Sequence, residues 1–210
     1  MAQSQSINYV RVAEVLTELG MITQEKAQSV VDRFGDLALE ALRPRPHIAG
    51  ALESFGVAVK IHADDVDLAD EEYESLLREA ASLTGGKVIV ENFRFEKDDE
   101  DDEDDEDDED DDDDGEENDE DDGCGTLYFE RNGKELSFVV EQMSNDYLDM
   151  CAAQAAIEAL SPDDDPRSFR CVDHGPDYRP KSIDDVMILA TAEQREGLLQ
   201  HLGITFEEPW

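Results

Sequence analysis

Basic residues, cysteines and long apolar runs are all scarce in this chain. Only 17 of its 210 residues are Lys or Arg, against 57 Asp and Glu, so the formal net charge is −40. Few and scattered bases argue against nucleic-acid binding, and a surplus of carboxylates repels nucleic acids and anionic membranes. No stretch approaches the about 18 apolar residues of a membrane span. The composition therefore favours a protein that binds a basic protein partner.

Neither a secretory signal nor a disulfide framework is visible. Residues 1–6 are polar and lack an apolar run. Cys124, Cys151 and Cys171 are an odd number of cysteines with no CxxC pair, which fits a reducing compartment. We therefore expect a cytoplasmic protein in which Cys151 and Cys171 are packed in the core and Cys124 is exposed.

The surplus of negative charge is concentrated in one tract but is not confined to it. Residues 98–122 contain 23 acids, beginning with the triplet Asp-Asp-Glu repeated four times. Mutual repulsion and the lack of apolar residues prevent such a tract from folding. The rest of the chain still has 34 acids against 17 bases, a net charge of −17. The tract either attracts a basic partner electrostatically or is a tolerated expansion of a loop.

The chain offers no motif that predicts a catalytic, cofactor or metal site. Residues 110–115 match the start of a calcium loop, but Glu117 stands where an apolar residue is expected and Asp121 where a glutamate is. GxSxG, P-loop and GxGxxG patterns are absent, and paired carboxylates are too common to indicate acid–base chemistry. The histidines form no HxH, HxxxH or HExxH pattern; they are His47, His62, His174 and His201.

The first 55 residues read as a helical segment. Apolar residues at helical spacing predict helices over 7–19 and 24–34, the second capped by Thr23 and ended by Gly35. A third helix near 36–42 is expected to end before two prolines, Pro44 and Pro46.

Strand and helix signals alternate through the remainder. We expect strands at 57–62, 87–95, 167–173 and 185–190, the last buried on both faces, and a short edge strand at 204–206. Helices are expected at 71–83, at 147–160 with Ser144 or Asp146 as its cap, and after the capping box that Thr191 begins.

A hairpin is the clearest local feature. Asn132-Gly133 lies between TLYFER and KELSFVVE, and both residues tolerate the positive φ of a type I′ turn. The two-residue loop sets the register, which places Leu127, Phe129 and Val140 on one face. Tyr128 and Glu130 then point the other way.

These elements predict an α+β fold: a mostly antiparallel sheet with helices packed on one face, an N-terminal helical group and a disordered acidic insertion loop. The expected division is a helical segment at 1–55, an α+β domain at 56–97 and 124–210, and the insertion at 98–123. Because long loops add little closure entropy, the tract is expected to interrupt a loop of one sheet rather than link two domains.

Tyrosines and carboxylates near element ends are the candidate partner-binding residues. Tyrosine supplies contact area and carboxylates select a basic partner. The segment SNDYLDM combines the two at a strand-to-helix junction, and two aspartates follow His62. The candidate set is Asp146, Tyr147, Asp149, Tyr128, Glu130, Asp64 and Asp65. The ordinary alternative for both segments is helix capping in a solvated loop.

The pattern from the hairpin onward resembles immunity-type proteins of bacterial polymorphic toxin systems. It covers roughly residues 125–206: the hairpin, SNDYLDM, a helix, DDDPRSFRCVD and DVMILATAEQREGLLQHLGITF. The resemblance implies a small cytoplasmic α+β protein that blocks a toxin by binding it. The long acidic insertion departs from that pattern.

Three hypotheses follow. The first is a non-enzymatic acidic binding protein, an immunity-like inhibitor that blocks a basic partner such as a toxin and touches neither nucleic acid nor membrane. The second is a nucleic-acid mimic or histone-type chaperone that acts through the tract. The third is a hydrolase or metal enzyme with an unfamiliar site.

Overall fold

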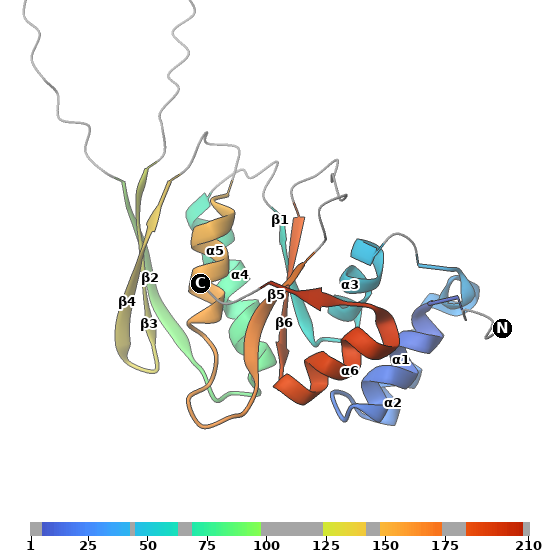
Figure 1. The fold of residues 1–210 in the computed structure, drawn as a ribbon. Helices are drawn as coiled ribbons and strands as arrows, with labels where there is room; N and C mark the ends of the chain where they lie inside the picture. Colours follow the sequence, from blue (N-terminus) through green and yellow to red (C-terminus); the bar gives the residue numbers. More distant parts are fainter. Residues whose placement is uncertain are drawn as a thin grey trace, which may run out of the picture.

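Two antiparallel sheets with two helices between them organise the chain, as the computed structural model in Figure 1 shows. The structure describes residues 6–42, 45–62, 69–97, 124–141, 148–173 and 184–207. The helices are α1 (Tyr9–Glu18), α2 (Gln24–Phe34), the 3₁₀ helix η1 (Gly35–Leu39), α3 (Arg45–Ser54), α4 (Ala69–Leu83), α5 (Met150–Glu158) and α6 (Ala192–Leu202). The strands are β1 (Ala58–His62), β2 (Val90–Lys97), β3 (Gly125–Arg131), β4 (Lys134–Val140), β5 (Ser168–Asp173), β6 (Asp184–Ala190) and β7 (Thr205–Phe206). Within these residues no helix is long and apolar enough to cross a membrane.

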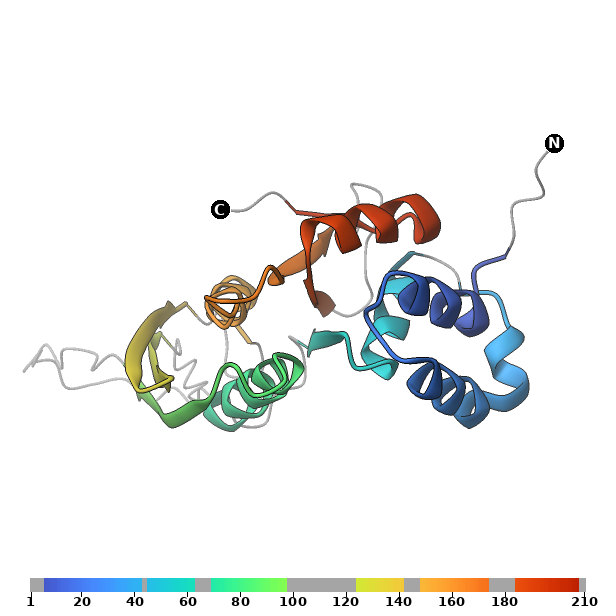
Figure 2. The same cartoon turned by 90° about the horizontal axis from the view of Figure 1, so that it is seen from below.

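The layers are stacked along the length of the molecule. One sheet has the order β1-β6-β5-β7 and the other the order β2-β3-β4. Helices α4 and α5 lie between the two sheets, and α1, α2, α3 and α6 lie beyond the four-stranded sheet (Figures 1 and 2). The α+β class and the antiparallel pairing are confirmed. Two details of the expected arrangement are wrong: the strands form two sheets instead of one, and helices cover both faces of the four-stranded sheet instead of one face.

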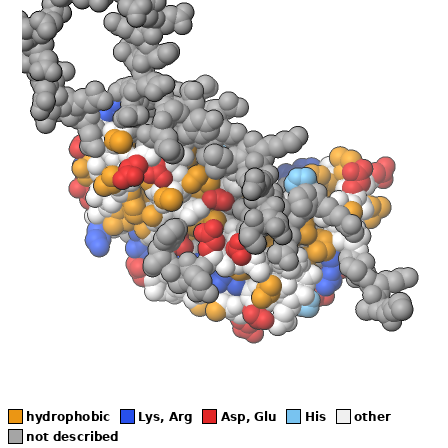
Figure 3. Space-filling view, turned by 45° about the horizontal axis from the view of Figure 1, so that its top comes forward, with side chains coloured by type: hydrophobic (Ala, Val, Ile, Leu, Met, Phe, Trp, Pro, Cys, Tyr) orange, Lys and Arg blue, Asp and Glu red, His pale blue; other side chains and the backbone are white. Residues whose placement is uncertain are grey.

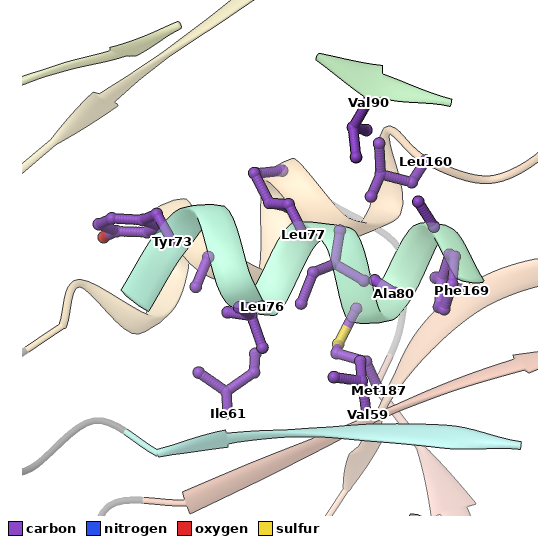
Figure 4. Close-up of a cluster of buried hydrophobic side chains, with 14 of the residues drawn as sticks. Val59, Ile61, Tyr73, Leu76, Leu77, Ala80, Val90, Leu160, Phe169 and Met187 are labelled. Atoms are coloured by element: carbon purple, nitrogen blue, oxygen red, sulfur yellow. The ribbon is translucent and has the colours of Figure 1, made fainter. Parts of the chain in front are cut away.

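The first core fills the space between the two sheets. Helix α4 supplies its centre, where Tyr73 and Leu77 are fully buried. Figure 4 shows Leu76 of α4 above Ile61 of β1, with Met187 of β6 beside Val59. Burying a large apolar side chain contributes about 1.5–3 kcal/mol, so this cluster ties the three-stranded sheet to the rest of the fold.

The second core joins the N-terminal helices to the opposite face of the four-stranded sheet. Val12 and Leu16 of α1 pack with Ile188 of β6 and Leu198 of α6 in one cluster of buried side chains. Strand β6 therefore contributes to both cores, since Met187 belongs to the first and Ile188 to the second. The prediction of a strand buried on both faces at residues 185–190 is confirmed for 186–190, whereas Asp185 is only partly buried.

The hairpin has the predicted turn and register. Asn132 and Gly133 have φ of 52° and 77°, and Phe129 pairs with Leu136 across the two strands. The Thr191–Gln194 capping box of α6 is also present. Both features depend on the chemistry of a few adjacent residues, and both are confirmed.

The acidic tract interrupts a sheet, as predicted. Strand β2 ends at Lys97 and β3 begins at Gly125, and these two residues pair directly. The strands on either side of residues 98–123 are thus immediate neighbours.

Three local expectations need correction. Residues 45–54 form helix α3, although no helix was expected beyond Pro46; a proline is tolerated in the first turn, where the N–H has no intrahelical partner. The helix expected near 36–42 is a 3₁₀ turn over residues 35–39. Helix α5 begins at Met150 with Asp149 as its cap, not after Ser144 or Asp146, which lie outside the described residues.

Candidate partner-binding face

One face of the three-stranded sheet is turned away from both cores. The register places alternate residues of each strand on it, because side chains along a strand point to opposite faces in turn. We call this set the outer face; it comprises Glu91, Arg94, Glu96, Thr126, Tyr128, Glu130, Glu135, Ser137 and Val139. Its inner counterparts Leu127, Phe129 and Val140 are buried in the first core.

A bulge in β2 decides which residues belong to the outer face. Glu91 pairs with Glu130 and Arg94 pairs with Tyr128, so one extra residue stands on β2 between these pairs. Asn92 lies at this point with φ of 56°. Without the bulge, Glu91 and Arg94 would point to opposite faces, since they are three positions apart along the strand.

Three glutamates form a row across the outer face. Glu130 of β3 lies directly opposite Glu91 of β2 on one side and Glu135 of β4 on the other. Like charges directly opposite each other destabilise an antiparallel pair. We call Glu91, Glu130 and Glu135 the glutamate row.

The single basic residue of the outer face partly offsets this row. Arg94 donates from Nη1 to Glu135 at 2.8 Å and from Nε to Glu96 at 2.9 Å. Its guanidinium also lies 4.0 Å from the centroid of the Tyr128 ring. The hydrogen bond to Glu135, followed by that to Glu96, raises the pKa of Arg94. Among the described residues, neither Glu91 nor Glu130 forms an ion pair.

The predicted partner-binding residues are divided by the structure. Tyr128 and Glu130 are neighbours on the outer face, as their alternation predicted. The predictions for Asp146, Tyr147, Asp64 and Asp65 fall outside the described residues. The sequence pattern did not single out Glu91 and Glu135, because their position opposite Glu130 depends on strand pairing.

Asp149 lies away from the outer face and is engaged in holding local structure. Its Oδ1 accepts from the backbone N–H groups of Cys151 and Ala152, at 2.9 and 3.1 Å. Its Oδ2 accepts from the N–H of Glu141 at 2.9 Å. The carboxylate therefore caps α5 and ties that helix to the end of β4.

A second polar cluster lies where β1 ends and β6 begins. Asp184 accepts from Lys60 Nζ at 2.9 Å and lies 2.8 Å from His62 Nδ1. An aspartate in this position orients an imidazole, but within the described residues no hydroxyl or thiol is hydrogen-bonded to His62. No group of three or more metal-ligating side chains occurs in the part of the chain that the structure describes.

The cysteines differ from one another in exposure. Cys171 is buried as predicted, and burial, followed by the nearby Asp185 carboxylate, raises the pKa of its thiol. The prediction that Cys151 is buried is wrong: its side chain is exposed, because it lies in the first turn of α5 on the side away from the buried Ala152 and Ala153. Cys124 is intermediate in exposure.

The groove between α1 and α2 does not include the His62 cluster. It has a volume of about 370 Å³ and is lined by Val10, Ala13, Val31 and neighbouring residues, none of them His or Cys. Figure 3 shows acidic side chains at several separate places among apolar and basic ones. The outer face is distinguished by its opposed glutamates.

Comparison with known proteins identifies no relative. No protein-family model, no curated protein and no solved structure matches the chain.

Proposed function

We propose that this is a binding protein, not a catalyst, and that it engages a basic protein partner through the outer face of β2, β3 and β4. The specific role we propose is that of an immunity-like inhibitor which blocks a toxin in the cytoplasm. The pattern of elements after the tract supports this role, since it resembles that of immunity-type proteins.

The glutamate row is the observation that carries the proposal. Opposed like charges lower stability, and folds accept such local conflicts chiefly at functional sites. Cationic side chains of a partner would relieve the repulsion, because they would neutralise Glu91 and Glu130, for which the described residues supply no ion pair. Tyr128 lies next to the row and offers aromatic contact area of the kind enriched at interface centres.

The position of the acidic tract supports the same partner chemistry. Because Lys97 pairs with Gly125, the tract enters and leaves the fold at one end of the sheet that bears the outer face. Its 23 acids add negative potential there, and such potential extends for about 8 Å at physiological ionic strength. A cationic partner would be attracted toward the outer face from solution.

A second candidate function rests on the tract by itself. A tract with 23 acids in 25 residues, inserted between two paired strands, suits a nucleic-acid mimic or a histone-type chaperone. In that case the outer face would be incidental, and binding would depend on residues 98–122.

Affinity capture separates the two candidates. Three forms of the protein would be immobilised and exposed to a lysate of the source organism at low and at high salt, and captured proteins identified by mass spectrometry. One form is unaltered, one lacks residues 98–122, and one carries Gln at Glu91, Glu130 and Glu135. A charge-matched control carries Gln at three exposed helix positions, Glu18, Glu193 and Glu196.

The proposal expects a basic protein that is retained at low salt, released at high salt and lost from the outer-face variant but not from the helix control. Loss on deletion of the tract alone, with the outer-face variant unaffected, would favour the mimic or chaperone. Capture of no basic protein at low salt by any form would contradict both.

A further inference from the structure

The two edges of the three-stranded sheet are unequal. Strand β2 is interrupted by the bulge at Asn92 and carries Arg94, Glu96 and Lys97 in its second half. Strand β4 pairs with β3 without interruption over its whole length, and its only charged residues are Lys134 and Glu135 beside the turn. Bulges and charges are the devices that protect sheet edges from pairing with other chains. The β2 edge has them, and most of the β4 edge does not.

The turn determines which backbone groups of β4 point away from β3. In a hairpin with a two-residue loop, the residues flanking the loop form a hydrogen-bonded pair, and such pairs then alternate along the strands. Residues 134, 136, 138 and 140 therefore direct their N–H and C=O groups toward β3. Glu135, Ser137 and Val139 direct theirs outward, and all three residues are exposed.

The side chains along this edge match an added strand on both faces. Leu136 and Phe138 are partly buried against the first core, so apolar residues of an incoming strand would extend that packing. On the outer face Glu135 is charged, whereas Val139 is apolar and 66% exposed. The edge thus presents alternating side chains beside three outward backbone positions.

Charge selects the occupant of this edge. Pairing of β4 with β4 of a second copy would bring together two bodies that each carry a net charge of −17 outside the tract, and two tracts of 23 acids. Such like-charge juxtaposition opposes association. A cationic strand would instead place its charges beside Glu135 and close to Glu130.

We infer that β4 recognises its partner by strand addition: an extended, lysine- or arginine-bearing segment of the partner protein pairs antiparallel with residues 135–139. Main-chain hydrogen bonds to Glu135, Ser137 and Val139 supply affinity. Basic side chains opposite Glu135 supply selectivity. This inference rests on the proposed function and adds the mode of recognition to it.

A short synthetic peptide of alternating Lys and Val, blocked at both ends, is the probe. Residues of an added strand that lie opposite 135, 137 and 139 turn their amides toward β4 and their side chains to the outer face; in the productive alignment these are the lysines. N-methylation of the lysine amides removes those hydrogen bonds and keeps the charge. N-methylation of the valine amides is the matched control, since these amides point away from β4.

Binding would be followed by NMR on the ¹⁵N-labelled full chain, with amide hydrogen exchange. We expect the plain and valine-methylated peptides to slow exchange at Glu135, Ser137 and Val139. The lysine-methylated peptide should bind about tenfold more weakly or worse, because it loses several main-chain hydrogen bonds. Val139→Pro should have the same effect with the plain peptide, and Val139→Thr, which keeps the N–H, should not.

The possible outcomes distinguish strand addition from the proposed function on which it rests. Equal binding of the three peptides, with shifts at Tyr128 and Glu130 but no slowed exchange in β4, would overturn strand addition and leave the proposed function standing. Failure of the plain peptide to perturb either the outer face or β4 at low salt would contradict both. Thermal unfolding of Val139→Pro checks that the variant folds, and the peptide series does not depend on it.

Discussion

Glu130 of β3 lies directly opposite Glu135 of β4, on the face of the three-stranded sheet that no core covers. Glu135 receives a hydrogen bond from Arg94, whereas Glu130 has a third carboxylate, Glu91, on its other side. The sheet therefore holds one carboxylate between two others. A cationic partner would convert this unfavourable arrangement into a favourable one.

Glu130→Gln should make the protein more stable and a poorer binder. Removing the central charge relieves two opposed pairs, each worth about 0.2–1 kcal/mol, so the melting temperature should rise by about 1–8 °C for a chain of this size. Glu196→Gln on α6, which also removes one exposed carboxylate, serves as the control. Differential scanning calorimetry measures the melting temperature of both variants. A fall in melting temperature on Glu130→Gln would refute the repulsion that we assign to the glutamate row.

Asn132→Ala should weaken the attachment of the hairpin to β2. The Asn132 side chain accepts from the N–H of Ile89 at 2.8 Å and donates to the carbonyl of Lys87 at 3.1 Å, while its backbone holds φ of 52°. Loss of the bonds together with a left-handed alanine should cost about 1–3 kcal/mol. Asn132→Gly loses the bonds but not the backbone freedom, so it should be less destabilised by about 1 kcal/mol. Urea unfolding compares the two; equal losses would mean that φ at this turn is not under strain.

Asp149→Ala should destabilise the start of α5 and the end of β4 together. The substitution removes a helix cap, which costs about 0.5–2 kcal/mol, and deprives the Glu141 N–H of its acceptor. Asp149→Asn keeps one side-chain oxygen and should lose less. The free energy of unfolding in urea measures the loss, and hydrogen exchange locates it. A loss confined to α5, with the Glu141 amide unaffected, would show that the link to β4 is unimportant.

Asp165 should make stability depend on pH in the acid range. Arg167 donates from Nε and Nη2 to the two carboxylate oxygens, and Lys87 lies 3.2 Å away. Hydrogen bonding to Arg167 is the main reason why the pKa of Asp165 lies well below its usual range. A depressed pKa in the folded state stabilises the fold above the unfolded pKa of about 4, and the contribution is lost as pH falls through the folded value.

The stability difference between the unaltered protein and Asp165→Asn should therefore be constant above about pH 4 and shrink below it. Asp164→Asn is the matched control, since Asp164 is 84% exposed and lies 3.8 Å from Lys87. Urea unfolding at a series of pH values measures both differences. A difference for Asp165→Asn that does not change with pH would show that the pair with Arg167 contributes no charge-dependent stability.

Features that depend on neighbours in the chain were predictable. The Asn132-Gly133 turn, the register it imposes and the Thr191 cap are all present. The insertion of the tract within one sheet was also predictable, because strand signals continue on both sides of it and the closure of a long loop costs little.

Features that depend on pairing or packing between distant segments were not predictable. His62 meets Asp184 across 122 residues, and no spacing rule connects them. The exposure of Cys151 depends on which side of α5 faces the first core. Glu91 joins the outer face only because of the bulge at Asn92.

The amino-acid sequence by itself determined the class of fold, the hairpin with Tyr128 and Glu130 on one side, and the excess of negative charge. Only the tertiary structure decided that the strands form two sheets, that Glu91, Glu130 and Glu135 stand in a row, and that the β4 edge has no described neighbour strand. The physical reason is the distance along the chain over which each interaction acts. Turn chemistry and hydrophobic periodicity act over a few residues, whereas strand pairing and burial are settled among segments that meet only when the whole chain folds.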